Sequence, residues 1–199
     1  MPDVIWATPL YEFLRQCDLS PLDKTVLDCG AGGDVPPLSL FYRHGYRTCG
    51  IDIQEEAVAK AERFCRENRM PLNIFLGDMR NIPFASESFS FVFSFNAIFF
   101  MTKADIAIAM REIERVLTPN GLCYVNFTSV DDPDRRPFGD NAYARRLLGS
   151  ERFAYYEDNE ADAYFKNFTV LRKEKRLLEK LVHEKRLRQA YIEYIAKKK

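Results

Sequence analysis

Three carboxylates in the first half of the chain each stand at the end of a predicted buried strand. Asp28 belongs to the apolar run KTVLDC, Asp52 ends GIDI, and Asp78 ends FLGD. A single aspartate in such a place is most often a turn or helix cap. Ligands of parallel sheets bind beyond the carboxyl ends of the strands, so three such residues in succession predict a shared ligand site.

The first carboxylate is followed at once by a glycine loop, DCGAGGD. Gly30 and Gly32 match the first two glycines of the dinucleotide fingerprint G-x-G-x-x-G, but Val35 occupies the third place. A carboxylate beside the loop repels a pyrophosphate and suits a ligand that presents an ammonium group. Asp52 can then accept both hydroxyls of a ribose, and Asp78 an exocyclic amine of adenine. An ammonium, a ribose and an adenine with no phosphate between them describe S-adenosylmethionine.

Strand-like and helix-like segments alternate through the first 130 residues. Strands are predicted over 24–29, 48–53, 72–76, 88–95 and 122–127. Helices are predicted over 36–44 and 54–69, and from a capping box formed by Thr102 and Asp105 to the turn signal TPNG. Strands joined by helical crossovers predict a doubly wound α/β domain with a parallel sheet and helices on both faces.

Together these motifs resemble the small, single-domain class I S-adenosylmethionine-dependent methyltransferases. The resemblance rests on VLDCGAGGD, GIDI, LGDMRNIPF, SFSFVFSFNAIFFM and EIERVLTPNGLCYVNF, which follow the order and spacing of that family from about residue 24 to 127. It implies a Rossmann-like, mostly parallel seven-stranded sheet that ends in an antiparallel strand pair. Propensity alone favours a helix in the last 30 residues, so the strand pair there follows from the resemblance.

The resemblance also implies which residues hold the donor, S-adenosyl-L-methionine, and its product, S-adenosyl-L-homocysteine. The glycine loop lies against the methionine part, Asp52 takes the ribose, Asp78 and the backbone of Met79 take the adenine, and Asn96 lines the methyl-bearing side. The full set of predicted cofactor-binding residues is Asp28, Gly30, Ala31, Gly32, Asp52, Ile53, Asp78, Met79 and Asn96. Asp34 departs from the pattern, because many members carry a third loop glycine there.

No catalytic base can be assigned from the sequence. Many members that act on small molecules place a histidine after the fourth strand, where this chain reads NAIFFM. His44 and His183 fall elsewhere, and Tyr155, Tyr156 and Asp158 are weak alternatives. A base is needed only when the acceptor must lose a proton, since the main tasks are alignment and the exclusion of water.

The chain is expected to form one domain over residues 1–199. Its predicted parts are an N-terminal helical cap (1–20) that includes Trp6, a donor-binding core (24–129), an insertion over the acceptor site (130–165) and the C-terminal strand pair (166–199). An aromatic acceptor wall is predicted from Tyr11, Phe95, Phe99, Phe100 and Phe127.

The amino-acid composition argues against a disulfide-bonded, a metal-binding and a membrane-spanning protein. Five cysteines without a CxxC pair and only two histidines predict reduced core thiols, no metal site and a cytoplasmic protein. No apolar run is long enough for a membrane span, no signal peptide is recognisable, and no membrane partner is expected. The net charge is zero, yet residues 171–199 carry 11 Lys/Arg against 4 Asp/Glu.

The sequence therefore predicts an S-adenosylmethionine-dependent methyltransferase for a small-molecule acceptor that it does not identify. Three alternatives stay open: an RNA or protein acceptor bound through the basic tail, a non-catalytic donor-binding regulator, and an NAD-dependent oxidoreductase. Nucleic acid is not the expected partner, and the oligomeric state is not predicted.

Overall fold

The computed structural model describes residues 8–133, 154–182 and 185–199, and these residues form four α-helices and one sheet. The helices are α1 (Thr8–Asp18), α2 (Leu38–Arg43), α3 (Glu55–Asn68) and α4 (Lys103–Val116), with 3-10 helices η1 (Ile98–Phe100) and η2 (Glu160–Phe165). The strands are β1 (Thr25–Cys29), β2 (Arg47–Asp52), β3 (Ile74–Leu76), β4 (Phe89–Ser94), β5 (Leu117–Ser129), β6 (Tyr155–Tyr156), β7 (Phe168–Val182) and β8 (Lys185–Lys198).

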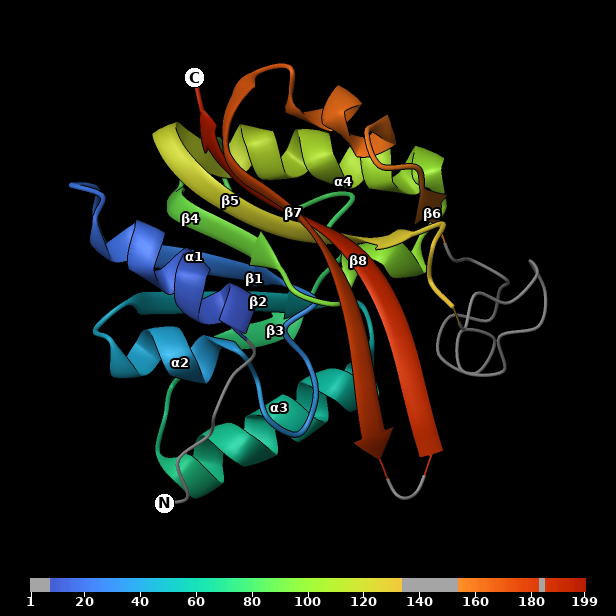
Figure 1. Cartoon of the computed structure of the whole chain (residues 1–199). Helices are drawn as coiled ribbons and strands as arrows, with labels where there is room; N and C mark the ends of the chain where they lie inside the picture. The colour runs from blue at the N-terminus through green and yellow to red at the C-terminus, as the bar shows by residue number, and fades with distance from the viewer. Residues whose placement is uncertain (1–7, 134–153, 183–184) are drawn as a thin grey trace.

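The strands lie in one sheet with the order β3-β2-β1-β4-β5-β8-β7, and β6 pairs with β5 off this path (Figure 1). Strands β1 to β6 pair in parallel, whereas β8 runs antiparallel to both β5 and β7. The predicted doubly wound α/β sheet with an antiparallel C-terminal pair is confirmed. The two-residue β6 is the addition to the seven strands predicted.

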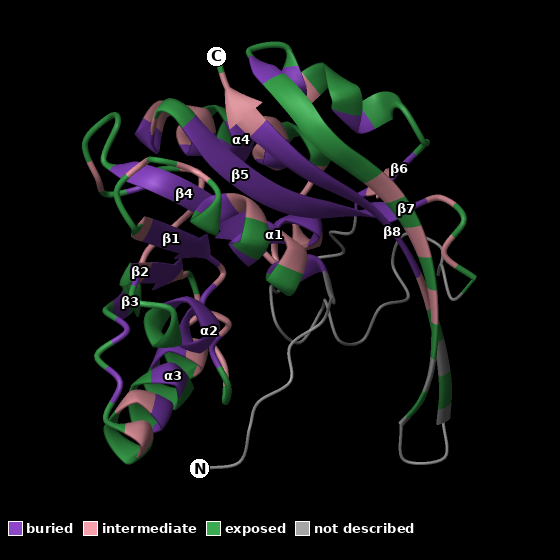
Figure 2. Cartoon of the chain, turned by 60° about the vertical axis from the view of Figure 1, so that its left-hand side comes forward, coloured by how far each residue is buried: buried purple, intermediate pink, exposed green. Residues whose placement is uncertain are grey.

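The C-terminal tail forms strands despite its helical propensity because tertiary contacts decide its structure. Alternate β8 residues enter two different cores: Tyr194 packs in one and Ile195 in the other. Figure 2 shows β5 and most of β8 buried, with β7 as the more exposed edge strand. A helix could not bury both sets of side chains against β5.

Helices cover both faces of the sheet (Figure 1). We call the face packed against α4 and η2 the α4 face, and the face packed against α1, α2 and α3 the α1 face. On β5 the side chains of Cys123, Val125 and Phe127 enter the α4-face core, whereas Leu122 and Tyr124 enter the α1-face core. Side chains alternate along a strand, so this pattern assigns every β5 position to a face.

Two local predictions need correction. TPNG does not form a separate turn, because Phe89 of β4 pairs with Leu117 and Phe91 with Leu122. The residues between them form a bulge within β5, where Asn120 has a positive φ of 62°. Phe127 is fully buried in the α4-face core, so it is a core residue and not part of an acceptor wall.

The N-terminal helix α1 packs on the sheet through one apolar side. Leu10, Phe13 and Leu14 are buried in the α1-face core, and Trp6 lies outside the described residues. None of the described helices is long and apolar enough to cross a membrane. All five cysteines are unpaired.

The capping box at the start of α4 is confirmed and offers a test of the fold. Thr102 Oγ1 accepts a hydrogen bond from the Asp105 amide at 3.1 Å and donates to the Asp105 carboxylate at 2.8 Å. We expect Thr102→Ala to lower the free energy of unfolding by about 0.5–2 kcal/mol in urea denaturation, because an amide of the first turn loses its acceptor. The exposed Ser86→Ala should change it by less than about 0.5 kcal/mol. Equal stability of the two variants would contradict a capping role.

Candidate functional site

A pocket of about 470 Å³ opens at the carboxyl ends of β1 to β4. Its walls come from the segments that follow these strands, together with the start of α3. Seven of the nine predicted cofactor-binding residues line it: Gly30, Gly32, Asp52, Ile53, Asp78, Met79 and Asn96. The other two, Asp28 and Ala31, are fully buried and do not line it.

The glycine loop is held so close to its neighbours that two of its positions have no room for a side chain. A Cβ atom on Gly30 would lie 2.2 Å from the Ala97 Cβ atom, and Gly30 has a positive φ of 101°. A Cβ atom on Gly32 would lie 2.5 Å from the Ala57 Cβ atom and 2.7 Å from Asp52 Oδ2. The loop is therefore a cradle of bare backbone that a ligand can approach closely.

Asp52 connects the glycine loop to the start of α3 by hydrogen bonds, and its carboxylate can still accept further hydrogen bonds from a ligand. Its Oδ2 accepts the Gly32 amide at 2.9 Å, and its Oδ1 accepts the Gln54 amide at 3.0 Å. Each carboxylate oxygen can accept about two hydrogen bonds. One acceptor position on each oxygen is therefore left for the pocket, which fits a pair of vicinal hydroxyls.

Asp28 is buried on the α1 face of β1, between Gly50 of β2 and Phe93 of β4. Neither of its carboxyl oxygens has a hydrogen-bond partner among the described residues. Burial raises the pKa of Asp28 well above its usual range, and the nearby carboxylate of Asp52 adds to the rise. A buried acid without a partner is costly, and a cation bound above it would compensate.

Asp78 is held by a residue that the sequence did not single out. Arg80 donates from Nε to both Asp78 oxygens at 3.0 Å and from Nη2 to Oδ2 at 2.6 Å. This hydrogen bonding lowers the pKa of Asp78. Arg80 Nη1 also bonds to Asp105 at 3.2 Å, so the arginine joins the end of β3 to α4. An adenine amine at Asp78 would have to share the carboxylate with Arg80.

Asn96 forms a reciprocal pair with Asn126 of β5. The Asn96 amide donates to Asn126 Oδ1 at 2.8 Å, and Asn126 Nδ2 donates to Asn96 Oδ1 at 2.7 Å. Asn126 is fully buried, and Asn96 holds a positive φ of 56°. Sequence reasoning missed Asn126, although an amide inside the apolar run LCYVNF is a signal that it is needed there.

Asp34 lies at the rim of the pocket. Its carboxylate is 3.7 Å from the Lys60 ammonium of α3, and its side chain is 75% exposed. Gly33, which the prediction passed over, has a positive φ of 111°, and its amide donates to the Ala57 carbonyl at 2.9 Å. The positive φ that the loop requires is thus met one residue before Asp34.

None of the weak base candidates Tyr155, Tyr156 and Asp158 lines the pocket, and His183 lies outside the described residues. His44 follows α2. Tyr156 is buried on the α4 face, with its hydroxyl 2.9 Å from that of Tyr164, and Asp158 pairs with Lys175. Of the predicted aromatic wall, Phe100 lines the pocket.

The residues present fit S-adenosylmethionine. The cradle has no side chain above the loop, Asp52 has two acceptor positions to spare, and Asp28 is a buried acid that lacks a partner. The pocket volume lies within the range typical of small-molecule sites. Among the described residues, no cluster of three or more His, Cys, Asp or Glu side chains could hold a metal ion.

Comparison with known proteins agrees with this geometry. Residues 27–125 match a family described as a methyltransferase domain. An uncharacterized protein of Haemophilus influenzae is 29% identical over 102 residues, a match that covers 50% of this chain and 41% of that protein. The chain thus aligns with about two fifths of the length of that curated relative.

Solved structures share the fold at low sequence identity. TehB from Haemophilus influenzae has a TM-score of 0.73 at 17% identity, covering 95% of this chain and 62% of that one. A S-adenosylmethionine-dependent methyltransferase from Methanosarcina mazei has a TM-score of 0.68 at 17% identity, covering 98% and 99%. The 1,6-didemethyltoxoflavin-N1-methyltransferase of Burkholderia thailandensis, solved with 1,6-didemethyltoxoflavin and S-adenosylhomocysteine, has a TM-score of 0.67 at 14% identity, covering 96% and 78%.

The buried Asp28 carboxyl predicts a pH dependence of stability. Its pKa in the folded protein is raised above the unfolded value of about 3.9, so the folded state keeps a proton that the unfolded state loses as pH rises. Relative to Asp28→Asn, the wild type should lose up to about 1.4 kcal/mol of unfolding free energy per pH unit above pH ~4, until the folded pKa is reached. Urea denaturation of both proteins between pH 4 and 8 measures this difference. The exposed Asp23→Asn is the control and should run parallel to the wild type; parallel curves for Asp28→Asn would disprove the effect.

Proposed function

Because the chain belongs to the class I S-adenosylmethionine-dependent methyltransferases, we propose that it transfers a methyl group from this donor to a small-molecule acceptor. The observation that carries the proposal is the pocket at the carboxyl ends of β1 to β4, where the bare glycine loop, Asp52, Asp78 and Asn96 surround one cavity.

We assign the donor's parts to this pocket as follows. The Gly30–Gly32 loop takes the methionine part, with the buried acid of Asp28 compensating the ammonium from beneath the loop. Asp52 takes the ribose hydroxyls, and Asp78 with Met79 takes the adenine. Bound there, the donor supplies an electrophilic methyl group together with its own leaving group. The protein's task is to orient the acceptor and exclude water.

The assignment of the donor to this pocket also gives a role to each of the four predicted segments of the chain. The described lining of the donor pocket comes entirely from within residues 24–129, which supports this segment as the donor-binding core. In the proposed division, residues 1–20 form a helical cap, residues 130–165 lie over the acceptor site and residues 166–199 complete the sheet. Residues 134–153 of the insertion lie outside the described residues. The unpaired cysteines support a cytoplasmic location.

The charges of the C-terminal hairpin favour a small acceptor over nucleic acid. Several of its basic residues are paired with acids: Lys173 with Asp162, Lys175 with Asp131 and Asp158, Arg172 with Glu12 and Glu174, Arg176 with Glu193, and Arg186 with Glu179. A phosphate-binding surface needs basic groups that are free to replace counterions. One structural neighbour is named for N1-methylation of 1,6-didemethyltoxoflavin, which also favours a small acceptor.

Donor binding can be tested without knowing the acceptor. We expect S-adenosylhomocysteine to bind the purified protein in calorimetry, and Asp52→Asn to weaken binding by about 1.5–3 kcal/mol, or at least about tenfold, because a charged acceptor of two hydroxyls is lost. The matched control is Asp34→Asn at the pocket rim, whose exposed ion pair should matter by less than about 1 kcal/mol. Absence of any S-adenosylhomocysteine binding would refute the proposed function, and equal effects of both variants would refute the ribose assignment.

An activity assay with labelled donor distinguishes a small-molecule acceptor from RNA. The protein is incubated with methyl-labelled donor and either a panel of metabolites or total RNA. Label in a small molecule supports the proposal. Label in RNA, lost as salt is raised, would point to the alternative acceptor.

A further inference from the structure

Arg80 takes up the whole hydrogen-bonding capacity of the Asp78 carboxylate in the donor pocket. Asp78 Oδ1 accepts hydrogen bonds from the Arg80 amide at 2.8 Å and from Arg80 Nε at 3.0 Å. Asp78 Oδ2 accepts from Arg80 Nε at 3.0 Å and from Nη2 at 2.6 Å. Since a carboxylate oxygen accepts about two hydrogen bonds, Asp78 can accept a ligand amine only where the amine displaces Arg80.

The carboxylate of Asp52, in the same pocket, is open to a ligand. Its two oxygens each accept one backbone amide, from Gly32 at 2.9 Å and from Gln54 at 3.0 Å. Asp52, Asp78 and Arg80 all line the pocket. The pocket therefore presents one carboxylate with acceptor positions to spare and one that is engaged by the chain's own guanidinium.

Arg80 can release Asp78 and still keep an acidic partner. Its Nη1 donates to Asp105 Oδ1 of α4 at 3.2 Å while its Nη2 bonds to Asp78. Asp105 is fixed at the start of α4 by its hydrogen bonds with Thr102. The side chains of Arg80 and Asp78 are each 32% exposed, so their contact can open without unpacking the core. The guanidinium thus lies between two carboxylates, one in the adenine part of the pocket and one on α4.

Only a hydrogen-bond donor gains by taking the place of Arg80. The hydrogen bonds from Arg80 lower the pKa of Asp78, so its carboxylate is ionised and accepts hydrogen bonds without donating any. The N–H₂ group of an adenine can replace the guanidinium at Asp78. A purine with a C–H in place of that amine has nothing to offer the carboxylate.

We propose that Arg80 is an internal competitor for the adenine subsite: it holds Asp78 until an adenine amine displaces it, and it then stays bound to Asp105. The inference rests on the proposed function and specifies how its donor pocket is regulated. The class of ligand that displaces Arg80 is a nucleoside with an exocyclic amine on its base.

Competition of this kind lowers the affinity for the donor. The apparent affinity of a ligand falls with the fraction of molecules whose site is open to it. The reduction should be about two- to fivefold, because a partly exposed ion pair contributes little stability. Loss of the guanidinium should then tighten binding. If Arg80 instead served to orient Asp78 for the adenine, its loss would weaken binding.

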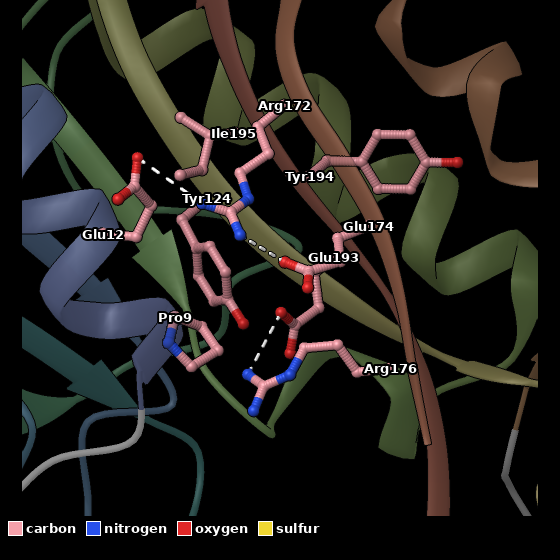
Figure 3. A pocket seen from close by; sticks show the side chains of 9 residues that line it. All are labelled: Pro9, Glu12, Tyr124, Arg172, Glu174, Arg176, Glu193, Tyr194 and Ile195. Atoms are coloured by element: carbon pink, nitrogen blue, oxygen red, sulfur yellow. Dashed lines mark hydrogen bonds and ion pairs between the residues drawn. The ribbon is translucent and has the colours of Figure 1, made fainter. Parts of the chain in front are cut away.

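Arg172 forms the same kind of bridge away from the donor pocket. It stands beside a smaller pocket of about 190 Å³, on the α1 face where α1 meets β5, β8 and β7. The wall of this smaller pocket includes Tyr124, Arg176 and Glu193. Arg172 Nη2 lies 2.6 Å from Glu174 and its Nη1 lies 3.6 Å from Glu12 (Figure 3). The two pockets share no lining residue, so Arg172 is a matched control for Arg80.

The test measures binding of S-adenosylhomocysteine by calorimetry in the wild type, Arg80→Met and Arg172→Met. We expect Arg80→Met to bind it about two- to fivefold more tightly than the wild type, and Arg172→Met to bind it as the wild type does. Arg80→Lys should lie between the wild type and Arg80→Met, because an ammonium cannot fork onto both carboxylate oxygens. If Arg80→Met does not fold, Arg80→Lys carries the same test.

Two nucleosides that differ only in the amine isolate the contested group. Adenosine carries an N–H₂ at carbon 6 of the purine, and purine riboside carries hydrogen there. In NMR titrations we expect Arg80→Met to tighten adenosine about two- to fivefold and to leave purine riboside unchanged. Equal tightening of both nucleosides would reveal an apolar contact of the new methionine and overturn the inference.

The outcomes separate the role of Arg80 from the proposed function. Unchanged or weaker binding of S-adenosylhomocysteine in both Arg80 variants would refute the competition and leave the methyltransferase assignment standing. So would an equal gain in Arg172→Met, or absence of adenosine binding in Arg80→Met. If S-adenosylhomocysteine binds to none of the proteins, the proposed function itself fails.

Discussion

The close approach of the glycine loop to its neighbours is the constraint on which the donor pocket depends. Gly30 lies against Ala97 after β4, and Gly32 lies against Ala57 of α3. Any side chain at either position would push apart elements that come from three different strands of the sheet. Because the loop is bare, the ends of β1, β2 and β4 can converge, and the carboxylate of Asp52 can bond to the loop while facing the pocket. Asp34, at the exposed end of this loop, needs no glycine because Gly33 already supplies the positive φ.

Three buried side chains without hydrogen-bond partners lie on one face of the sheet. Asp28, Tyr124 and Thr128 all project toward the α1 face, and their side-chain oxygens have no hydrogen-bond partners among the described residues. The α4 face, by contrast, is packed by an apolar cluster that includes most of α4. Buried polar atoms without partners cost stability, and these three residues place that cost on the α1 face.

Arginine–carboxylate pairs fix the rims of both pockets. Arg80 joins Asp78 to Asp105 beside the donor pocket, while Arg172 joins Glu12 to Glu174 beside the smaller one. Arg80–Asp105 and Arg172–Glu12 join different elements, whereas Arg172 and Glu174 both lie on β7. The forked hydrogen bonds of Arg80 to Asp78 fix the orientation of that carboxylate as well as its charge. At least five of the 11 basic residues of the C-terminal tail form such ion pairs within the protein: Arg172, Lys173, Lys175, Arg176 and Arg186.

The sequence by itself determined the half of the sheet that carries the pocket at the carboxyl ends of β1 to β4. The glycine loop, the aspartates at successive strand ends and the helix cap at Thr102 are local signals, because each depends on backbone conformation or on the end of one strand. Parallel strands bring their ends to one edge, so the pocket at the carboxyl ends of β1 to β4 followed from these signals. The C-terminal strands did not follow from propensity, which favoured a helix; pairing with β5 decided them. The smaller pocket was decided by tertiary structure alone, since Tyr124, Arg176 and Glu193 meet only through the register of β5, β8 and β7. Isolated polar residues in apolar strands signal that a partner is needed, but only the fold shows which residue stands opposite.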